Sequence, residues 1–195
     1  MRRIAEAAEA RYEVKGSRFL SHLVPIEAFE ALRERLRAEH PKASHIVYAY
    51  RRVNEYDQIV ENSGDDGEPK GCAGAPTLSV LRGAGLVECA LLTVRYFGGI
   101  KLGTGGMARA YGAAARAAVE AATLLPYEKL LGRSYTCSYD TLRRIEYLLK
   151  HSRVTILATD YGSEGIRLRI RGSVEALKAF ENEAGDWLRG ADQGS

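Results

Sequence analysis

The chain is organised around the stretch Thr93-Val94-Arg95-Tyr96-Phe97-Gly98-Gly99-Ile100-Lys101-Leu102-Gly103-Thr104-Gly105-Gly106, which runs into an alanine-rich segment, residues 107–122. The apolar residues that lead into it predict a strand, the five glycines predict a loop, and the alanines predict a long helix. Residues 89–119 contain no carboxylate, but they contain four basic side chains: Arg95, Lys101, Arg109 and Arg116. Helix starts attract negative charge, so any anion bound at this one must come from outside the chain.

Length and composition set the class of protein. The chain has 195 residues, of which 46% are hydrophobic, which is enough for one large or two small domains with a genuine core. Its 28 basic and 25 acidic residues give a net charge of +3, so a basic surface must be local. No apolar run is long enough to span a membrane, and the N-terminus does not resemble a secretory signal. We therefore expect a cytoplasmic protein with no membrane association.

The three cysteines, Cys72, Cys89 and Cys137, are widely spaced and form no CxxC or Cys/His ligand pattern. This pattern is typical of buried, reduced thiols and not of a zinc site. The sequence assigns no metal and no cofactor.

Hydrophobic periodicity predicts a mixed first half. The expected elements are a short helix or frayed end over 1–10, a strand over 12–24 with an irregularity at Gly16, a helix over 26–40, a strand over 44–53, its hairpin partner over 56–60, a loop over 61–71, a helix over 75–81, a central strand over 86–97 and a helix over 105–123. Pro126 marks the expected boundary, giving domains 1–126 and 127–195.

The second half predicts a βαββα order. The expected elements are a strand over 130–139, a helix to Lys150, a strand over 154–161, a turn over 162–165, a strand over 166–170 and a final helix that Ser173 caps and that includes Trp187 and Leu188. Only residues 190–195 remain for a last strand.

The glycine loop has two interpretations, which the sequence leaves open. In the first, the N–H groups of Gly103, Thr104, Gly105 and Gly106 bind a phosphate, with charge from Arg95, Lys101 and Arg109. In the second, the glycines turn the chain and let the helix pack closely. Residues 103–108 fit G-x-G-x-x-A, but no strand with an acidic end follows, and no P-loop is present.

The loop over 61–71 carries four carboxylates within eight residues. Asp65, Asp66 and Glu68, with His45, have the oxygen-rich chemistry that Mg²⁺ prefers. The alternative, which we favour, is a turn that is solvated or pairs with the basic stretch. Ser63 is not in a G-x-S-x-G elbow, and no histidine lies in a recognised signature with it, so no catalytic residue is assigned.

Arg167, Arg169 and Arg171 alternate along one expected strand and would share one face of a sheet. That face is either solvated or directed at RNA. The repulsion among three neighbouring cations favours the second interpretation. Arg109 and Arg116 are seven residues apart and share one helix face, and we expect both to take part in binding the anion or nucleic acid.

Several ordered motifs resemble the YigZ/IMPACT family. They are Lys15-x-Ser17-Arg18-Phe19, Ala43-Ser44-His45, Gly64-Asp65-Asp66-Gly67-Glu68-Pro69, Ala73-Gly74-x-Pro76 and the stretch from Arg95 to Gly106. The resemblance implies an α+β protein of two domains. The N-terminal domain would share the βα sandwich of elongation factor G domain IV and of a small-subunit ribosomal protein. The C-terminal domain would be ferredoxin-like and similar to the last domain of elongation factor G.

The family's eukaryotic member regulates translation by interfering with activation of an initiation-factor kinase. That member carries an additional interaction domain, which we expect this chain to lack. Our first expectation is therefore a non-enzymatic protein that binds RNA, the ribosome or another phosphate-bearing partner, with a role in translation regulation. The alternative is a metal-dependent hydrolase or transferase, acting on a phosphorylated or peptide substrate where the Asp65/Asp66/Glu68 loop faces the glycine loop. A third possibility is a protein partner in translation control. The sequence does not predict the oligomeric state.

Overall fold

The computed structural model describes residues 1–193 and divides into two compact units, Met1–Tyr127 (unit 1) and Glu128–Ser195 (unit 2). Of the helices in this described part, none has both the length and the apolar character that crossing a bilayer requires.

Unit 1 is built on a five-stranded antiparallel sheet with the order β2-β3-β6-β4-β5. Its strands are β2 (Ala8–Val14), β3 (Ser17–Pro25), β4 (His45–Val53), β5 (Ile59–Gly64) and β6 (Cys89–Tyr96). A second, two-stranded sheet joins the ends of the unit, because β1 (Arg2–Ile4) pairs with β7 (Leu124–Pro126). The first ten residues, expected as a helix or a frayed end, therefore contain β1 and the start of β2.

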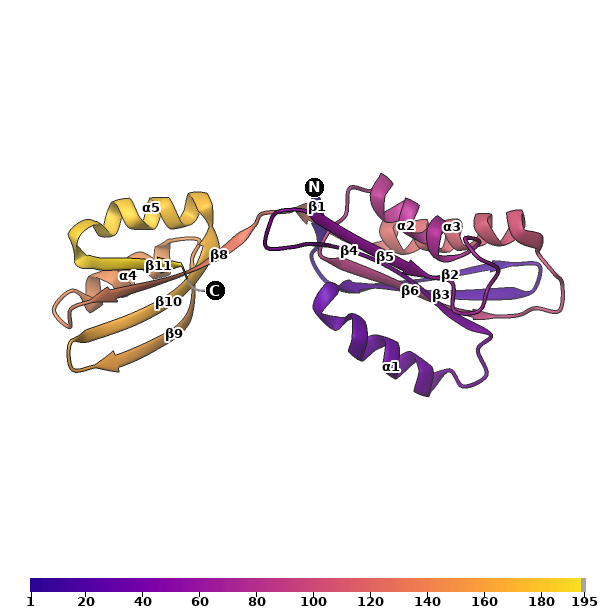
Figure 1. Ribbon diagram of the computed structural model, residues 1–195, viewed down its shortest axis with the longest axis horizontal. Coiled ribbons are helices and arrows are strands. Elements are labelled where there is room, and N and C mark those ends of the chain that lie inside the picture. Colours follow the sequence, from indigo (N-terminus) through magenta and orange to yellow (C-terminus); the bar gives the residue numbers. More distant parts are fainter. Residues whose placement is uncertain (194–195) are drawn as a thin grey trace. The chain divides into compact units, whose positions relative to one another are not determined.

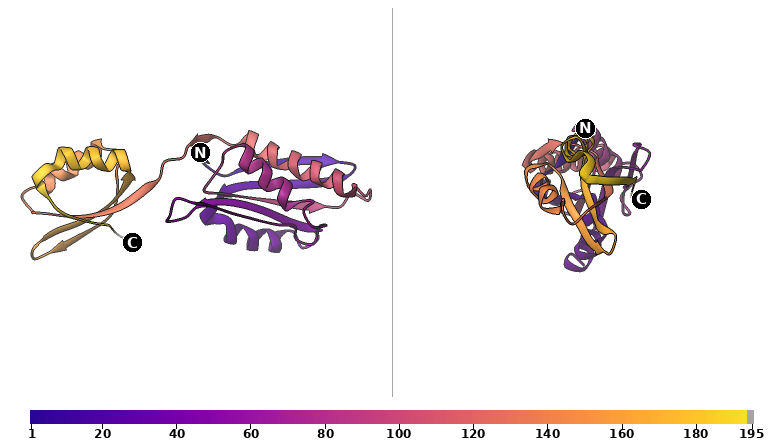
Figure 2. Two further views of the ribbon diagram at one scale, coloured as in Figure 1. Left: turned by 45° about the horizontal axis from the view of Figure 1, so that its top comes forward. Right: turned by 90° about the vertical axis from the view of Figure 1, so that its left-hand side faces the viewer.

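Helices cover both faces of this sheet. On one face lies α1 (Phe29–Glu39), which follows a 3₁₀ turn (Ile26–Ala28); on the other lie α2 (Gly74–Gly83) and α3 (Gly103–Ala121), side by side (Figures 1 and 2). β6 is the central strand and is buried on both sides, as its apolar run predicts. Burial raises the pKa of the Cys89 thiol on this strand to about 12, so the thiol stays protonated.

The expected strand over 12–24 is in fact two strands. Lys15 and Gly16 have positive φ angles of 47° and 76°, and they form a tight turn between β2 and β3. Two-residue hairpins of this kind require positive φ at both central positions. The periodicity of two runs on through the turn, so it could not separate one strand from two.

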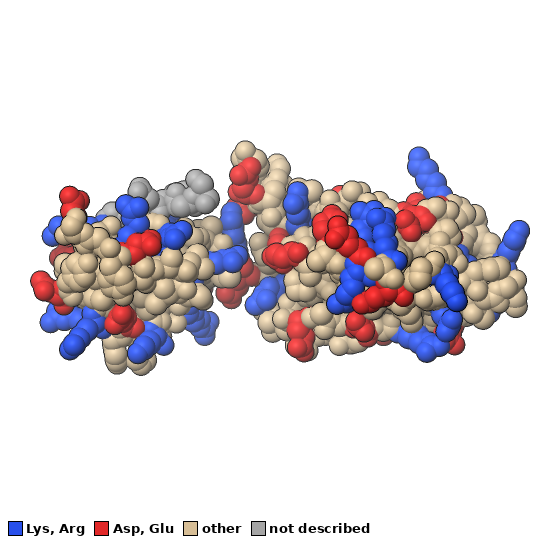
Figure 3. Space-filling model, turned by 90° about the horizontal axis from the view of Figure 1, so that it is seen from below, with Lys and Arg blue, Asp and Glu red and all other residues tan. Residues whose placement is uncertain are grey.

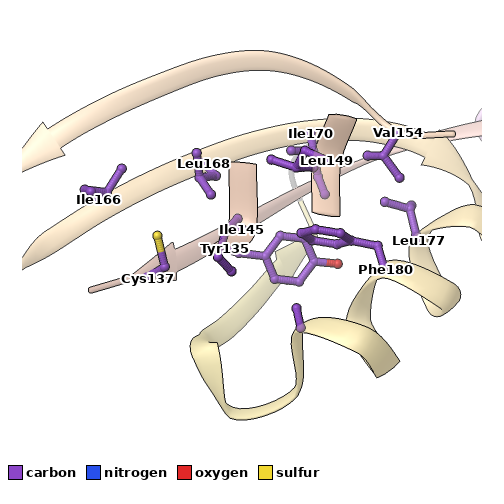
Figure 4. Close-up of a cluster of buried hydrophobic side chains, with 11 residues drawn as sticks. Tyr135, Cys137, Ile145, Leu149, Val154, Ile166, Leu168, Ile170, Leu177 and Phe180 are labelled. Atoms are coloured by element: carbon purple, nitrogen blue, oxygen red, sulfur yellow. The ribbon is translucent and has the colours of Figure 1, made fainter. Parts of the chain in front are cut away.

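Unit 2 has the element order βαββαβ and a four-stranded sheet with the order β11-β8-β10-β9. Its elements are β8 (Leu130–Cys137), α4 (Leu142–His151), β9 (Thr155–Gly162), β10 (Gly165–Ser173), α5 (Val174–Ala184), a 3₁₀ turn (Gly185–Trp187) and β11 (Leu188–Gln193). The Ser173 side chain caps α5 by accepting a hydrogen bond from the Ala176 N–H, as the sequence predicts. Both helices pack on one face of the sheet around Tyr135 and Phe180 (Figure 4).

The expected end of the last helix is wrong. α5 ends at Ala184, because Gly185 takes a φ of 49° that an L-residue rarely adopts. Leu188, expected on that helix, instead opens β11 and pairs with Cys137 of β8. The sixth element is therefore present, and its signal was the glycine that follows the apolar period.

Candidate functional site

The glycine loop owes part of its composition to packing. A Cβ atom at Gly98 would lie 1.9 Å from the carbonyl carbon of Gly16 and 2.1 Å from the nitrogen of Ser17, because the β2–β3 turn rests on it. The Gly98 N–H also donates to Ser17 Oγ over 3.2 Å. Gly99 and Gly103 have φ angles of 87° and 71°, which favour glycine. Gly98 and Gly99 thus follow the structural interpretation, whereas Gly103 combines a positive φ with a place at the start of α3.

The start of α3 keeps the features of an anion site. The helix begins at Gly103, Leu102 provides no side-chain cap, and the first turn contains no acid. Gly103, Thr104 and Gly105 are exposed, as is Lys101 just before them, while Gly106 is half-buried. Uncapped N–H groups at a helix start attract anions.

Arg95 does not belong to this anion site. It is only 5% exposed, and its guanidinium forms an ion pair with Glu68, which is itself 8% exposed. Alternation along β6 directs Arg95 to the α3 face of the sheet, beneath the helix and away from the loop surface. The expected use of Arg95 for an external anion is corrected on this ground: its charge is already neutralised inside the protein.

Glu68 is the centre of a buried polar cluster. Its Oε1 atom accepts a hydrogen bond from the hydroxyl of Tyr111 over 2.7 Å, and its Oε2 atom lies 3.7 Å from Nε2 of His45. Burial, with the adjacent carboxylate, raises the pKa of Tyr111 far above its ordinary value, so the phenol stays protonated and donates. Sequence reasoning missed Tyr111, whose only signal is a large residue among alanines.

Asp65 caps a helix from a distance. Its carboxylate accepts hydrogen bonds from the N–H groups of Gly71 (2.8 Å), Ala73 (3.0 Å) and Gly74 (2.8 Å), so it closes the start of α2. Burial alone would raise its pKa, but the three donors together lower it below the ordinary 3.8. This carboxylate therefore stabilises the fold.

Asp66 has a third, separate role. Its Oδ2 atom accepts a hydrogen bond from the Ile46 N–H over 2.6 Å, and its backbone carbonyl lies 2.6 Å from Nδ1 of His45. The carboxylates of Asp65, Asp66 and Glu68 thus have different partners, although His45 lies between the backbone carbonyl of Asp66 and the carboxylate of Glu68. Within the described residues, no group of three His, Cys, Asp or Glu side chains is placed to hold a metal ion.

We predict that Asp65→Ala lowers the free energy of unfolding by about 2–4 kcal/mol, since three N–H groups lose a charged acceptor. Because the folded-state pKa is depressed, the stabilisation is complete above about pH 4 and is lost as pH falls through that lower pKa. Urea unfolding of both proteins between pH 3 and pH 7 measures this. Asp65→Asn, which keeps an acceptor oxygen, should cost less. A difference between wild type and Asp65→Ala that does not change with pH would contradict the role of the charge.

The arginines of β10 lie on the face of the unit 2 sheet that no helix covers. Arg167, Arg169 and Arg171 are exposed, whereas the residues between them are buried against the helices. Opposite them on β8 stand Thr136, Ser134 and Gly132. Arg169 lies 3.8 Å from Asp160 of β9. Together with Arg189 they form what we call the basic sheet face.

Arg189 was not among the expected site residues. It is exposed on β11 and pairs in register with Thr136, as Arg167 does from the other side of β8. Residues opposite one another across paired strands share a face, so Arg189 joins the β10 arginines. The sequence could not place it, because the last strand was expected to start later.

Outside the basic sheet face, basic side chains either lie among acidic ones or are few and spaced apart. On the face of unit 1 that carries α1, acidic and basic side chains are interspersed (Figure 3). Arg109 and Arg116 are exposed on α3 and border a groove between α2 and α3. Among the described residues we distinguish three basic features: the α3 start with Lys101, the α2/α3 groove, which adjoins that start at Arg109, and the basic sheet face of unit 2.

Comparison with known proteins gives two family matches. A model described as the Impact N-terminal domain matches residues 15–119, and a domain of unknown function, DUF1949, matches residues 136–191. The Escherichia coli IMPACT family member YigZ is 37% identical over 93% of this chain and 90% of its own length. An IMPACT family member of Haemophilus influenzae is 36% identical over 88% of this chain and 84% of its own. The crystal structure of a hypothetical protein is 33% identical, with a TM-score of 0.75 over all of this chain and 97% of that one.

Proposed function

The chain belongs to the IMPACT family, and from this premise we propose that it is a non-enzymatic, cytoplasmic protein of translation control that binds a phosphate-bearing partner, RNA or the ribosome. The observation that carries the proposal is the basic sheet face. Its arginines project into solvent from β10 and β11, the two strands that flank β8, with no helix above them. Arginine is well suited to phosphate because its planar fork donates several hydrogen bonds.

The charge on this face is poorly balanced by the protein itself. Arg169 has Asp160 as a neighbour, but both side chains are more than half exposed, and pairs of that kind contribute little. Among the described residues, Arg167 and Arg171 have no ion pair. Such a surface attracts polyanions and repels itself when empty.

The start of α3 supplies a second contact in this proposal. Lys101 and the N–H groups of Gly103, Thr104 and Gly105 would hold a single phosphate group. The role in translation control rests on family membership and on the activity of the eukaryotic member. We further infer that unit 2 is a ferredoxin-like domain similar to the last domain of elongation factor G, which its βαββαβ order supports, and that unit 1 is related to domain IV of that factor.

We favour binding over catalysis because the carboxylates of the acidic loop are engaged in the fold. Asp65 caps α2, Asp66 holds the start of β4 and Glu68 neutralises Arg95. A hydrolase at this position would need a carboxylate that is open to a metal or to a substrate.

The decisive experiment reverses the charge of the basic sheet face. We expect Arg167→Glu/Arg169→Glu/Arg171→Glu to weaken binding of a fluorescent 20-nucleotide poly-uridine RNA by roughly 100-fold at low salt and to flatten its salt dependence, because phosphate contacts release counterions. Fluorescence anisotropy from 50 to 300 mM KCl measures both, and co-sedimentation with purified ribosomes tests the larger partner.

The matched control reverses three exposed charges on the helical side of the same unit, Arg143→Glu/Lys150→Glu/Lys178→Glu. Its change in net charge is identical, so a smaller loss than that of the β10 variant localises the site. Equal losses of RNA affinity in both variants would overturn the proposal. So would binding by the wild type that does not change with the concentration of KCl.

A further inference from the structure

A groove of about 620 Å³ runs between α2 and α3 on the outer side of unit 1. Val80 of α2 and Ala84, just after that helix, line one side, and Ala108, Gly112 and Val119 of α3 line the other. These side chains are short, so none crosses the furrow between the two helices. The opposite side of α3, which includes Tyr111 and Ala115, is already buried against the sheet. Val80, Ala84 and Val119 pack on the core of unit 1 and are only partly buried there. The groove is thus an apolar surface that unit 1 leaves partly uncovered.

Two arginines border the groove in a similar way. Nη1 of Arg109 lies 3.5 Å from the position that a Cβ of Gly105 would occupy, and Nη1 of Arg116 lies equally close to that of Gly112. Each guanidinium is therefore drawn back along the helix over a glycine, four residues earlier in the chain. A glycine within a helix lowers the stability of the helix by about 1 kcal/mol relative to alanine, so the room for each guanidinium comes at a cost in stability. Seven residues separate the arginines, so they recur after two turns, about 10 Å along the axis.

The charge of this pair is not matched from within. In the part of the chain that the structure describes, neither Arg109 nor Arg116 forms an ion pair, although Glu120 lies at one end of the groove. The occupant must therefore provide apolar groups for the floor and negative charge at two points two turns apart. A nucleic-acid backbone offers charge without apolar groups, and a single phosphate is too small for the volume.

We propose that the α2/α3 groove docks an amphipathic helix of a partner protein, whose apolar stripe fills the floor and whose carboxylates at positions i and i+7 pair with Arg109 and Arg116. A third helix lying in the groove between two others is a common way for helices to pack and for peptides to bind. This surface lies on unit 1 and is independent of the basic sheet face, so the chain would hold a protein as well as a phosphate-bearing partner.

The test uses synthetic probes of stated chemistry. One is a stapled 18-residue helix with a leucine stripe and Glu at positions i and i+7, and its twin carries Lys at those two positions. We expect the Glu helix to bind the wild type, with shifts of the Ala108 and Gly112 amide signals in NMR spectra. Arg109→Glu/Arg116→Glu should weaken this binding about tenfold or more and should instead bind the Lys helix.

Two further variants separate charge, groove and fold. Arg3→Glu/Arg52→Glu makes the same change in net charge outside the groove, on exposed strand positions of unit 1, and should leave binding of the Glu helix within about twofold. Ala108→Leu fills the floor and should abolish binding while thermal unfolding stays near that of the wild type.

Equal binding of the Glu and Lys helices by the wild type, or undiminished binding by Ala108→Leu, would overturn the proposal. So would displacement of the Glu helix by poly-uridine with shifts of the same amide signals, which would assign the groove to nucleic acid. The basic sheet face variant should bind the Glu helix normally, which distinguishes this proposal from the proposed function.

Discussion

Replacing Arg95 with methionine is expected to destabilise unit 1 by about 3–5 kcal/mol, because the change leaves Glu68 buried and charged without its cation. A loss of that size is a large part of the stability of a typical domain. The matched control is Lys101, an exposed cation that the same stretch of sequence assigned, with Arg95, to anion binding. Lys101→Met should change the free energy of unfolding by no more than about 0.5 kcal/mol. Urea unfolding followed by circular dichroism measures both.

A double variant identifies the cause of the loss. Arg95→Met/Glu68→Leu removes both charges together, so it should recover part of the stability lost in Arg95→Met, although the hydroxyl of Tyr111 then loses its acceptor. The role assigned to the ion pair is wrong if the double variant is less stable than Arg95→Met alone. It is also wrong if Arg95→Met is as stable as the wild type, since Arg95 would then be available to a ligand.

Gly98→Ala is expected to destabilise unit 1 by about 3 kcal/mol or more, since its methyl group would overlap backbone atoms of Gly16 and Ser17 and displace the β2–β3 turn. Backbone, unlike a flexible side chain, cannot move aside cheaply. The neighbouring glycine provides the control. No atom lies within 4 Å of a Cβ at Gly99, so Gly99→Ala should cost only the strain of its positive φ, about 1–2 kcal/mol.

Thermal unfolding ranks the two variants, and amide chemical shifts of Lys15 and Gly16 report whether the turn has moved. Equal losses for Gly98→Ala and Gly99→Ala would show that the close contact is not what requires glycine. Retention of stability together with loss of RNA binding in Gly98→Ala would restore the ligand interpretation for this position.

These outcomes bear on the question that the glycine loop raised. Its residues are compatible both with phosphate binding and with close packing. The structure gives Gly98 a packing reason, whereas the uncapped start of α3 and Lys101 keep the properties of an anion site. The two interpretations therefore apply to different residues of one stretch.

The sequence predicted a helix or a strand correctly where a single hydrophobic periodicity dominated the segment. The buried run from Cys89 to Tyr96, the helical spacing of Phe29, Leu32 and Leu36 and the cap at Ser173 each depend on residues within a turn or two of each other. The alternation of Arg167, Arg169 and Arg171 is of the same kind. Such patterns carry their own structural cause, because burial of one face fixes their spacing.

Tertiary structure alone decided which of these residues meet. One buried cluster combines Arg95 of β6, Glu68 of the acidic loop, Tyr111 of α3 and His45 of β4. No local spacing in the sequence predicts that these residues meet. Arg189 joined the basic sheet face only because β11 pairs with β8. Sequence determined most of the elements and their faces, since periodicity is a short-range property, but not the division of β2 from β3 or the start of β11. Strand pairing and helix packing over long separations determined which charges are neutralised inside the protein and which remain exposed to a partner.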